Sequence, residues 1–216
     1  MTLLELARGP ALEWALIIFL LGTSFRLASI FLFAKNKPLS APRVTSTTAG
    51  YRTIFSRMIP AAIFRKRPGI NFVSSTVWHL GFVFVLFLFT PHILFFEGLI
   101  GLSWPGVANS LVMPVAGFTL ILLVLAFIRR LRHPVLKKIS TVGDYLTLLV
   151  TALPLATGLM ASAHLVARYE TMLAIHLFSV CLLLVWFPFS KLMHLILFIP
   201  SRKRLGDKLG YKGVKA

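Results

Sequence analysis

The sequence predicts an all-α integral membrane protein, a single five-transmembrane-helix bundle with its N-terminus outside and its C-terminus in the cytoplasm. Three observations support this prediction. Of the 216 residues, 57% are hydrophobic and only six are Asp or Glu. Five apolar runs are too long for the core helices of a soluble protein, and none alternates as the strands of a membrane barrel do. The cations gather in alternate connections between these runs, which sets the orientation.

The five predicted spans run over residues 14–33, 72–96, 107–128, 142–166 and 172–199. No basic segment precedes the first run and no small-residue cleavage site follows it, and Glu5 and Glu13 flank its start. We therefore interpret it as a retained span and not as a signal peptide. The fourth run begins with Asp144, a carboxylate suited to the positive end of a helix.

The basic residues follow the connections. Residues 34–70 contain eight Lys and Arg, residues 129–139 contain five, and the tail 200–216 contains six. The other connections carry only Arg168, and the amino terminus carries only Arg8. By the positive-inside rule the three basic segments are cytoplasmic. The net charge of +17 is thus explained by topology and by contact with anionic membrane lipid, and it does not indicate nucleic acid.

Two further features lie in these connections. The segment from Arg52 to Phe64 is predicted to form a short amphipathic helix at the membrane surface. The triplets Arg65-Lys66-Arg67 and Arg202-Lys203-Arg204 suit either lipid or an acidic partner subunit. Cys181 is the single cysteine, so the chain forms no internal disulfide and holds no cysteine-ligated iron–sulfur cluster.

Four histidines lie inside the spans, two in the second and two in the fifth. His176 and His194 are 18 residues apart, which is five whole turns of one helix and a rise of roughly 27 Å. His79 and His92 are 13 residues apart, a rise of roughly 20 Å, and Pro91 is expected to kink the helix and re-aim His92. Since the two spans run in opposite directions, His79 is predicted to lie at the same membrane depth as His194, and His92 at the same depth as His176.

Histidines paired in this way predict haem. A bare imidazole is costly to bury in hydrocarbon, whereas iron takes one ring nitrogen and leaves the other to bond a neighbour. We expect two haems b, with His79 and His194 on the inner iron and His92 and His176 on the outer iron. The alternative is that each histidine bonds a facing helix or sits at the headgroup level. Zinc is disfavoured, because no acidic or cysteine ligand lies at these depths.

Other polar residues are predicted to serve the same site. His164, Arg168 and Glu97 fall near the outer haem level, where a quinol head group needs a proton acceptor and hydrogen-bond partners. Lys191 lies three residues before His194 and is a candidate to pair with a haem propionate or to snorkel to the surface. No residue is predicted to be catalytic in the strict sense, because substrate chemistry is expected on another subunit.

Several segments resemble the gamma-subunit family of respiratory nitrate reductase. They are Trp78-His79-Leu80-Gly81-Phe82, Thr90-Pro91-His92, His133-Pro134 with Ser140 to Tyr145, Thr157-Gly158, and His176 through Phe187-Pro188-Phe189-Ser190-Lys191-Leu192-Met193-His194. The resemblance covers roughly residues 70–200 and implies a five-span di-haem b cytochrome that exchanges electrons between membrane quinol and an iron–sulfur subunit. In the nitrate reductase members the two ligands of the second span lie closer together than His79 and His92. This favours the related branch in heterodisulfide-reductase-like complexes of sulfur metabolism.

The resulting expectation is a cytochrome b membrane-anchor subunit of a respiratory redox complex in the prokaryotic inner membrane. It would pass electrons between quinol or quinone and a cytoplasmic iron–sulfur partner through two stacked haems. A small membrane transporter and a structural anchor without haem are the alternatives. A transporter predicts polar residues and broken helices near the midplane, but the third span has none beyond Asn109, Ser110 and Thr119.

Overall fold

The computed structural model describes residues 1–33, 41–43, 48–59 and 69–214, and these residues form helices and turns without a β-strand. Five helical segments among them are long and apolar enough to cross a membrane. They are Leu3–Leu32, Gly69–Leu88, Asn109–Arg132, Val142–Ser162 and Tyr169–Phe189. The prediction of an all-helical chain with five spans is therefore confirmed for the described residues.

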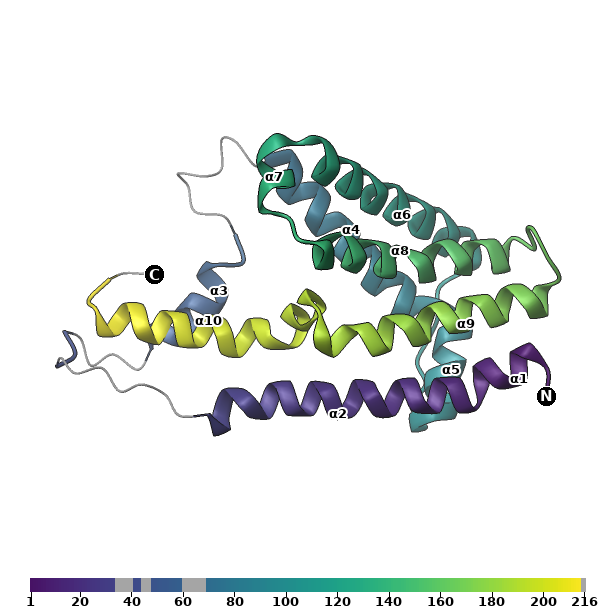
Figure 1. Ribbon diagram of the computed structural model, residues 1–216, viewed down its shortest axis with the longest axis horizontal. Helices are drawn as coiled ribbons and strands as arrows, with labels where there is room; N and C mark the ends of the chain where they lie inside the picture. Colours follow the sequence, from purple (N-terminus) through teal and green to yellow (C-terminus); the bar gives the residue numbers. More distant parts are fainter. Residues whose placement is uncertain (34–40, 44–47, 60–68, 215–216) are drawn as a thin grey trace. The chain divides into compact units, whose positions relative to one another are not determined.

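Contacts divide the chain into two compact units, which are described separately. The first comprises residues 1–19 and 70–186, and the second comprises residues 20–69 and 187–216. In the first unit, α8 (Val142–Ser162) packs along α9 (Tyr169–Trp186) and against α6 (Asn109–Arg132), as Figure 1 shows. A core of Val85, Val112, Ala116, Leu123 and Leu155 joins α4 (Gly69–Leu88), α6 and α8.

Helix α1 (Leu3–Arg8) and the first part of α2 (Pro10–Leu32), up to residue 19, complete the first unit. Thr2 and Glu5 form a reciprocal capping box that begins α1, and Gly9 separates it from α2. The side chains of Leu12 and Ala15 on α2 pack with Cys181 of α9. The predicted first span thus begins about one helical turn earlier than expected, at Pro10, with α1 added before it.

The second predicted span, residues 72–96, is two helices and not one. Helix α4 ends at Leu88 and α5 (Thr90–Ile100) begins after Phe89, whose ψ of 120° is extended backbone. Pro91 stands in the first turn of α5, where its missing N–H costs nothing. The Val107 N–H donates to the Leu88 carbonyl at 2.9 Å. The kink expected at Pro91 is therefore a complete break.

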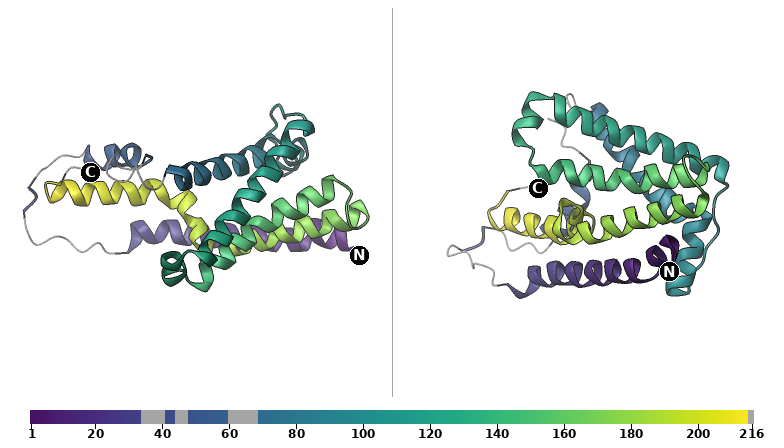
Figure 2. Two further views of the ribbon diagram at one scale, coloured as in Figure 1. Left: turned by 90° about the horizontal axis from the view of Figure 1, so that it is seen from above. Right: turned by 45° about the vertical axis from the view of Figure 1, so that its right-hand side comes forward.

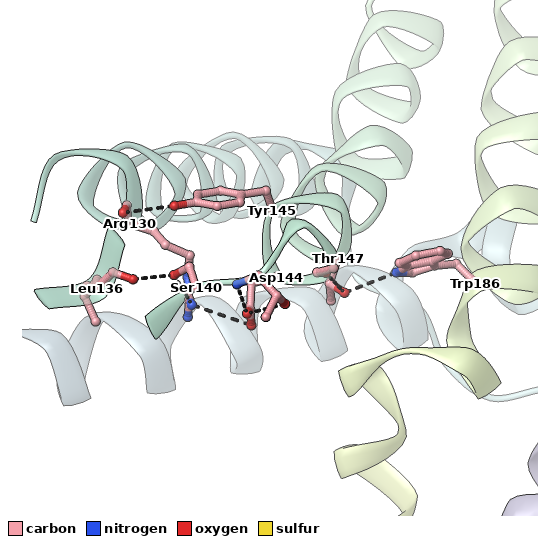
Figure 3. A network of polar contacts seen from close by, with 9 residues as sticks. Arg130, Leu136, Ser140, Asp144, Tyr145, Thr147 and Trp186 are labelled. Carbon is pink, nitrogen blue, oxygen red and sulfur yellow. Dashed lines mark hydrogen bonds and ion pairs between the residues drawn. The ribbon is translucent and has the colours of Figure 1, made fainter. Parts of the chain in front are cut away.

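A polar network joins the ends of α6, α7 (Pro134–Ile139) and α8 (Figure 3). The buried Asp144 carboxylate accepts hydrogen bonds from the Thr141 N–H and hydroxyl at 2.9 and 3.0 Å, and Arg130 lies 3.5 Å from it. Arg130 also donates to the Ser140 hydroxyl at 2.9 Å. Asp144 thus caps the start of α8, as predicted, and its negative charge balances the positive charge of Arg130.

The fifth predicted span, residues 172–199, is also interrupted, which contradicts the expectation of one helix from His176 to His194. Helix α9 ends at Trp186, two short turns follow at Phe187–Phe189 and Lys191–Met193, and α10 (His194–Tyr211) begins at His194. Pro188 lacks an N–H and cannot continue α9. The Ser190 hydroxyl stabilises the turn, because it donates to the Phe187 carbonyl at 3.2 Å and accepts from the Leu192 N–H at 3.1 Å.

In the second unit α3 (Ala49–Ser56) packs along α10, as Figures 1 and 2 show. Pro188 packs on Gly22 of α2, where an added Cβ would lie only 2.8 Å from the proline ring. Of the amphipathic helix expected from Arg52 to Phe64, residues 52–56 are helical within α3, and residues 57–59 form a turn and a bend. Its location at the membrane surface stays a prediction. Residues 60–64 of that prediction and the triplet at 65–67 lie outside the described residues.

Candidate haem-binding site

The structure brings His92 of α5 and His176 of α9 together. Their ring centroids lie 6.2 Å apart and their planes differ by 11°. Both side chains are half-buried within the first unit. The break at Phe89 and the pairing of α8 with α9 set this geometry, since the break puts His92 in the first turn of α5.

One nitrogen of His176 is held by α8. Its Nδ1 lies 3.3 Å from the Thr157 hydroxyl, and that hydroxyl donates to the Leu153 carbonyl at 2.7 Å. Because the hydroxyl hydrogen points at the carbonyl, the Thr157 oxygen accepts from the Nδ1–H of His176. The Ser179 hydroxyl lies 3.0 Å from that of Thr157 and donates to the His176 carbonyl at 2.6 Å.

Gly158 makes room for the same ring. A Cβ at this position would lie 3.1 Å from Cε1 and 3.2 Å from Nδ1 of His176, which is closer than ordinary van der Waals contact. Any larger residue would push the imidazole away from α8. The Thr157-Gly158 pair therefore fixes both the depth of the ring and the nitrogen that carries its proton.

His92 is fixed in the same manner by backbone. Its Nδ1–H donates to the Val85 carbonyl at 3.0 Å, seven residues earlier and across the break between α4 and α5. The ring also meets Phe89 edge-on, with centroids 5.1 Å apart. A carbonyl oxygen can only accept, so the proton of neutral His92 is on Nδ1 and its lone pair is on Nε2.

The distance between the two rings is compatible with one iron bound between two imidazoles. A metal–imidazole bond of about 2.0–2.1 Å and a ring radius of about 1.1 Å place the centroids of two rings on opposite sides of one metal roughly 6.3 Å apart. The spacing of 6.2 Å between His92 and His176 agrees with that figure. In both residues Nδ1 is bonded to the protein, which leaves Nε2 to bind metal, as is usual for histidine ligands.

The other predicted pair lies in two different units, His79 in the first and His194 in the second. His79 donates through Nδ1 to the Ser75 carbonyl at 2.6 Å and stacks on Trp78 with centroids 3.6 Å apart. His194 donates through Nδ1 to the Lys191 carbonyl at 2.7 Å. Each ring thus keeps its proton on Nδ1, as His92 does. Their pairing on one iron stays a prediction.

The helix break changes the geometry of the fifth span. His176 lies on α9 and His194 is the first residue of α10, so the count of five whole turns between them does not hold. The expectation that both rings project from one face of a single helix is therefore wrong. The reason is Pro188 with the Ser190 turn, which end α9 eight residues before His194.

The predicted quinone-site residues are only partly brought together. His164 lies in the exposed turn after α8 with a φ of 54°, and its ring contacts Tyr169 with centroids 5.4 Å apart. Arg168 is exposed in the same connection. Glu97 lies on α5, where Ser103 donates to its carboxylate at 3.2 Å. In the described part of the chain no hydrogen bond or ion pair joins Glu97 to His164 or Arg168.

Lys191 stands in the turn before α10, and its carbonyl holds His194. The residue as a whole is exposed, which is compatible with either predicted role. Among the residues that the structure describes, no group of three or more His, Cys, Asp or Glu side chains lies close enough to hold a metal ion. A haem iron needs only two protein ligands, because the porphyrin supplies the other four.

Three residues that contact His176 are not among the site residues predicted from the sequence. Thr157 and Gly158 enter only through the family resemblance, and Ser179 is not part of any predicted site. Ser179 stands three residues after His176, on the same helix face, which is the one sequence signal for it. The contact between Thr157 and His176 joins two helices and has no local signature.

Comparison with known proteins gives little beyond this geometry. No protein-family model matches the chain, and no solved structure matches it. A protein of Nitratidesulfovibrio vulgaris (strain Hildenborough), named only "Protein", is 27% identical over 207 residues. That similarity covers 92% of this chain and 89% of the relative. The name assigns no activity, so the functional argument rests on the site.

Proposed function

We propose that the chain is a cytochrome b membrane subunit of a quinone-linked redox complex, nearest to the heterodisulfide-reductase-like relatives of the nitrate reductase gamma family. It would hold two haems b and pass electrons between membrane quinol and a cytoplasmic iron–sulfur partner subunit. The observation that carries the proposal is the spacing of 6.2 Å between the nearly parallel rings of His92 and His176. A bound haem would supply reversible one-electron chemistry.

The residues of the chain have distinct roles in this proposal. His92 and His176 bind the outer iron through Nε2, while the Val85 carbonyl and the Thr157 hydroxyl fix their rings. Hydrogen bonds of this kind increase the basicity of the ligating nitrogen and set its direction. His79 and His194 stay the predicted ligands of the inner iron, and each has Nδ1 on a backbone carbonyl of its own unit.

The quinol site would lie at the outer end of α8. Oxidation of a quinol to a quinone releases two electrons and two protons, so the site needs a proton acceptor beside the ring. His164 is an exposed imidazole in the turn after α8, four residues before Arg168, and the carboxylate of Glu97 on α5 is a second candidate proton acceptor. With the N-terminus outside, these residues release protons to the outside, and the direction of electron flow follows the potentials of the partners.

The partner subunit would dock on exposed cations. In the second unit these are Arg204 and Lys208 of α10, and in the first unit they are Arg129, Arg132, Lys137 and Lys138 around α7. Each of these groups complements an acidic subunit and would steer its approach. In this proposal the chain lies in the inner membrane of a prokaryote with its C-terminus in the cytoplasm, as the distribution of cations predicts.

The test is the haem content of purified variants. We expect His92→Ala and His176→Ala each to lose the same one of two haems, and His79→Ala and His194→Ala each to lose the other. His133→Ala is the matched control, because His133 is an exposed histidine at the start of α7 and should retain both haems. The assignment is wrong if His92→Ala and His176→Ala bind as much haem as the wild type.

A further inference from the structure

The helix pair α3–α10 has two outer faces of opposite character. The inner faces of the two helices meet through small residues. A Cβ on Gly206 would collide with the side chain of Thr53 and lie 2.7 Å from the Ala49 carbonyl oxygen. A Cβ on Gly210 would lie 2.8 Å from the Cβ of Ala49. These contacts pair rising numbers on α3 with falling numbers on α10, so the helices are antiparallel.

The contact face of α3 leaves its aromatic residues outside. Gly50, Thr53 and Ile54 are buried against α10, and the Ile54 carbonyl accepts a hydrogen bond from Arg202 at 3.1 Å. Tyr51 and Phe55, four residues apart and hence on one face, are 59% and 70% exposed. By helical spacing Phe55 points away from α10, whereas Tyr51 stands at the edge of the contact, with Lys203 of α10 beside its ring.

The apolar character continues beyond the end of α3 and is bordered by cations. Met58 and Ile59, directly after the helix, are 46% and 60% exposed. Arg52 and Arg57 are exposed beside them. On α10, by contrast, Gly206 and Gly210 face α3. Arg204 and Lys208 are exposed, and each stands two residues before one of these glycines, which is about 200° around the helix.

We propose that the outer face of α3 lies on the bilayer surface and binds anionic lipid. In this arrangement Tyr51, Phe55, Met58 and Ile59 enter the boundary between head groups and acyl chains, and Arg52 and Arg57 contact the anionic head groups. An aromatic and aliphatic face bordered by arginine is the composition of helices that lie in the membrane plane. The proposal concerns a surface other than the haem site and does not depend on the haem being bound.

Charge complementarity selects an anionic leaflet as the occupant. Arg52 and Arg57 carry the net charge on this side. Lys203, with its Nζ 5.1 Å from the centre of the Tyr51 ring, is ion-paired with Asp207 and adds no net charge. The hydrogen bond from Lys203 to Asp207, 2.8 Å long, raises the pKa of the lysine, so it stays charged at neutral pH. Each cation near such a leaflet strengthens binding about fivefold.

The outer faces of α3 and α10 suit two different partners. An acidic subunit fits Arg204 and Lys208, where cations lie without exposed aromatic side chains beside them on the same face. The face with Tyr51 and Phe55 fits lipid, because large apolar side chains are stabilised by leaving water for the bilayer. Helix α10 begins five residues after the Phe187–Phe189 turn that ends the last apolar span, which keeps the pair tethered to the membrane.

The experiment uses the full chain with one labelled cysteine. Cys181 is the only natural cysteine, so Cys181→Ser gives a background without thiols. A nitroxide is attached at Phe55→Cys, and separately at Ser56→Cys, which is exposed but stands about 100° away around the helix. The labelled proteins are reconstituted in vesicles of phosphatidylcholine with and without phosphatidylglycerol, and far-UV circular dichroism checks that they are folded.

We expect the label at 55 to collide with oxygen, which partitions into the bilayer, at least threefold more often than with a water-soluble nickel chelate in the anionic vesicles. The label at 56 should show the opposite preference. Arg52→Gln with Arg57→Gln should reduce the difference in anionic vesicles and leave it unchanged in phosphatidylcholine alone.

Equal access of the chelate to both labels in anionic vesicles would overturn the proposal. The same holds if the label at 55 becomes shielded only when an acidic partner subunit is added, since that result would assign the face to a protein. If the label at position 55 lies at the same membrane depth in vesicles with and without phosphatidylglycerol, head-group charge plays no part in binding. That result would also contradict an anionic-lipid site.

Discussion

Replacing Thr157 with valine should change the potential of the outer haem without changing the fold. Valine keeps the shape of threonine and removes the hydroxyl that accepts from His176 Nδ1 at 3.3 Å. That hydrogen bond gives the imidazole more anionic character and stabilises ferric iron. Its loss should therefore raise the midpoint potential.

The size of the effect follows from the value of one hydrogen bond. A neutral hydrogen bond contributes about 1 kcal/mol, and for a one-electron couple about 1.4 kcal/mol corresponds to roughly 59 mV. The expected rise is thus about 40 mV. Thr157→Ser keeps the hydroxyl and should stay within about 10 mV of the wild type, a small fraction of one such bond.

The assay is a spectroelectrochemical titration of the purified protein. Thr151→Val is the matched control, because Thr151 is a buried threonine on the same helix whose hydroxyl donates to the Thr147 carbonyl at 2.7 Å and does not touch a histidine. A Thr157→Val potential equal to those of the wild type and of Thr151→Val would refute the role given to this hydroxyl.

Three other substitutions test particular contacts. Gly158→Val should displace the His176 ring, which a Cβ would approach to 3.1 Å, and should lower the content of the outer haem at a cost of about 1–3 kcal/mol. Haem quantification against Gly98→Val, where no atom lies within 4 Å of an added Cβ, would measure this loss. Asp144→Asn should destabilise the start of α8 by about 1 kcal/mol, seen as a lower midpoint in thermal unfolding, since it weakens the cap and the contact with Arg130. Gly206→Val should separate α3 from α10, and protease cleavage between them should become faster while haem content stays the same; unchanged cleavage would contradict the close packing of the pair.

The features that were predictable from sequence are those with local causes. The apolar runs gave the five spans because each span must bury its own backbone polar groups in a helix. Asp144 was placed correctly at the start of α8, since its cap involves residues only three positions apart. A distortion near the start of α5 was predicted because of Pro91, although a kink was expected and the helix breaks.

The features that escaped prediction depend on contacts between distant residues or on turns inside apolar sequence. Hydropathy continues from α9 into α10 through Pro188, so the run looked like one helix although its backbone turns there. The bond of His176 to Thr157 joins residues 19 positions apart on two helices. Val85 holds His92 through its backbone carbonyl, and because every residue has a carbonyl, the residue type does not indicate this role.

The central claim is tested most directly by the visible spectrum of the wild-type chain purified from membranes, with its haem-to-protein ratio. The account predicts a b-type band that sharpens on reduction with dithionite and a ratio of two haems per chain, set by four histidines. A folded, colourless protein would contradict it and would leave His92 and His176 as a ring pair that joins α5 to α9.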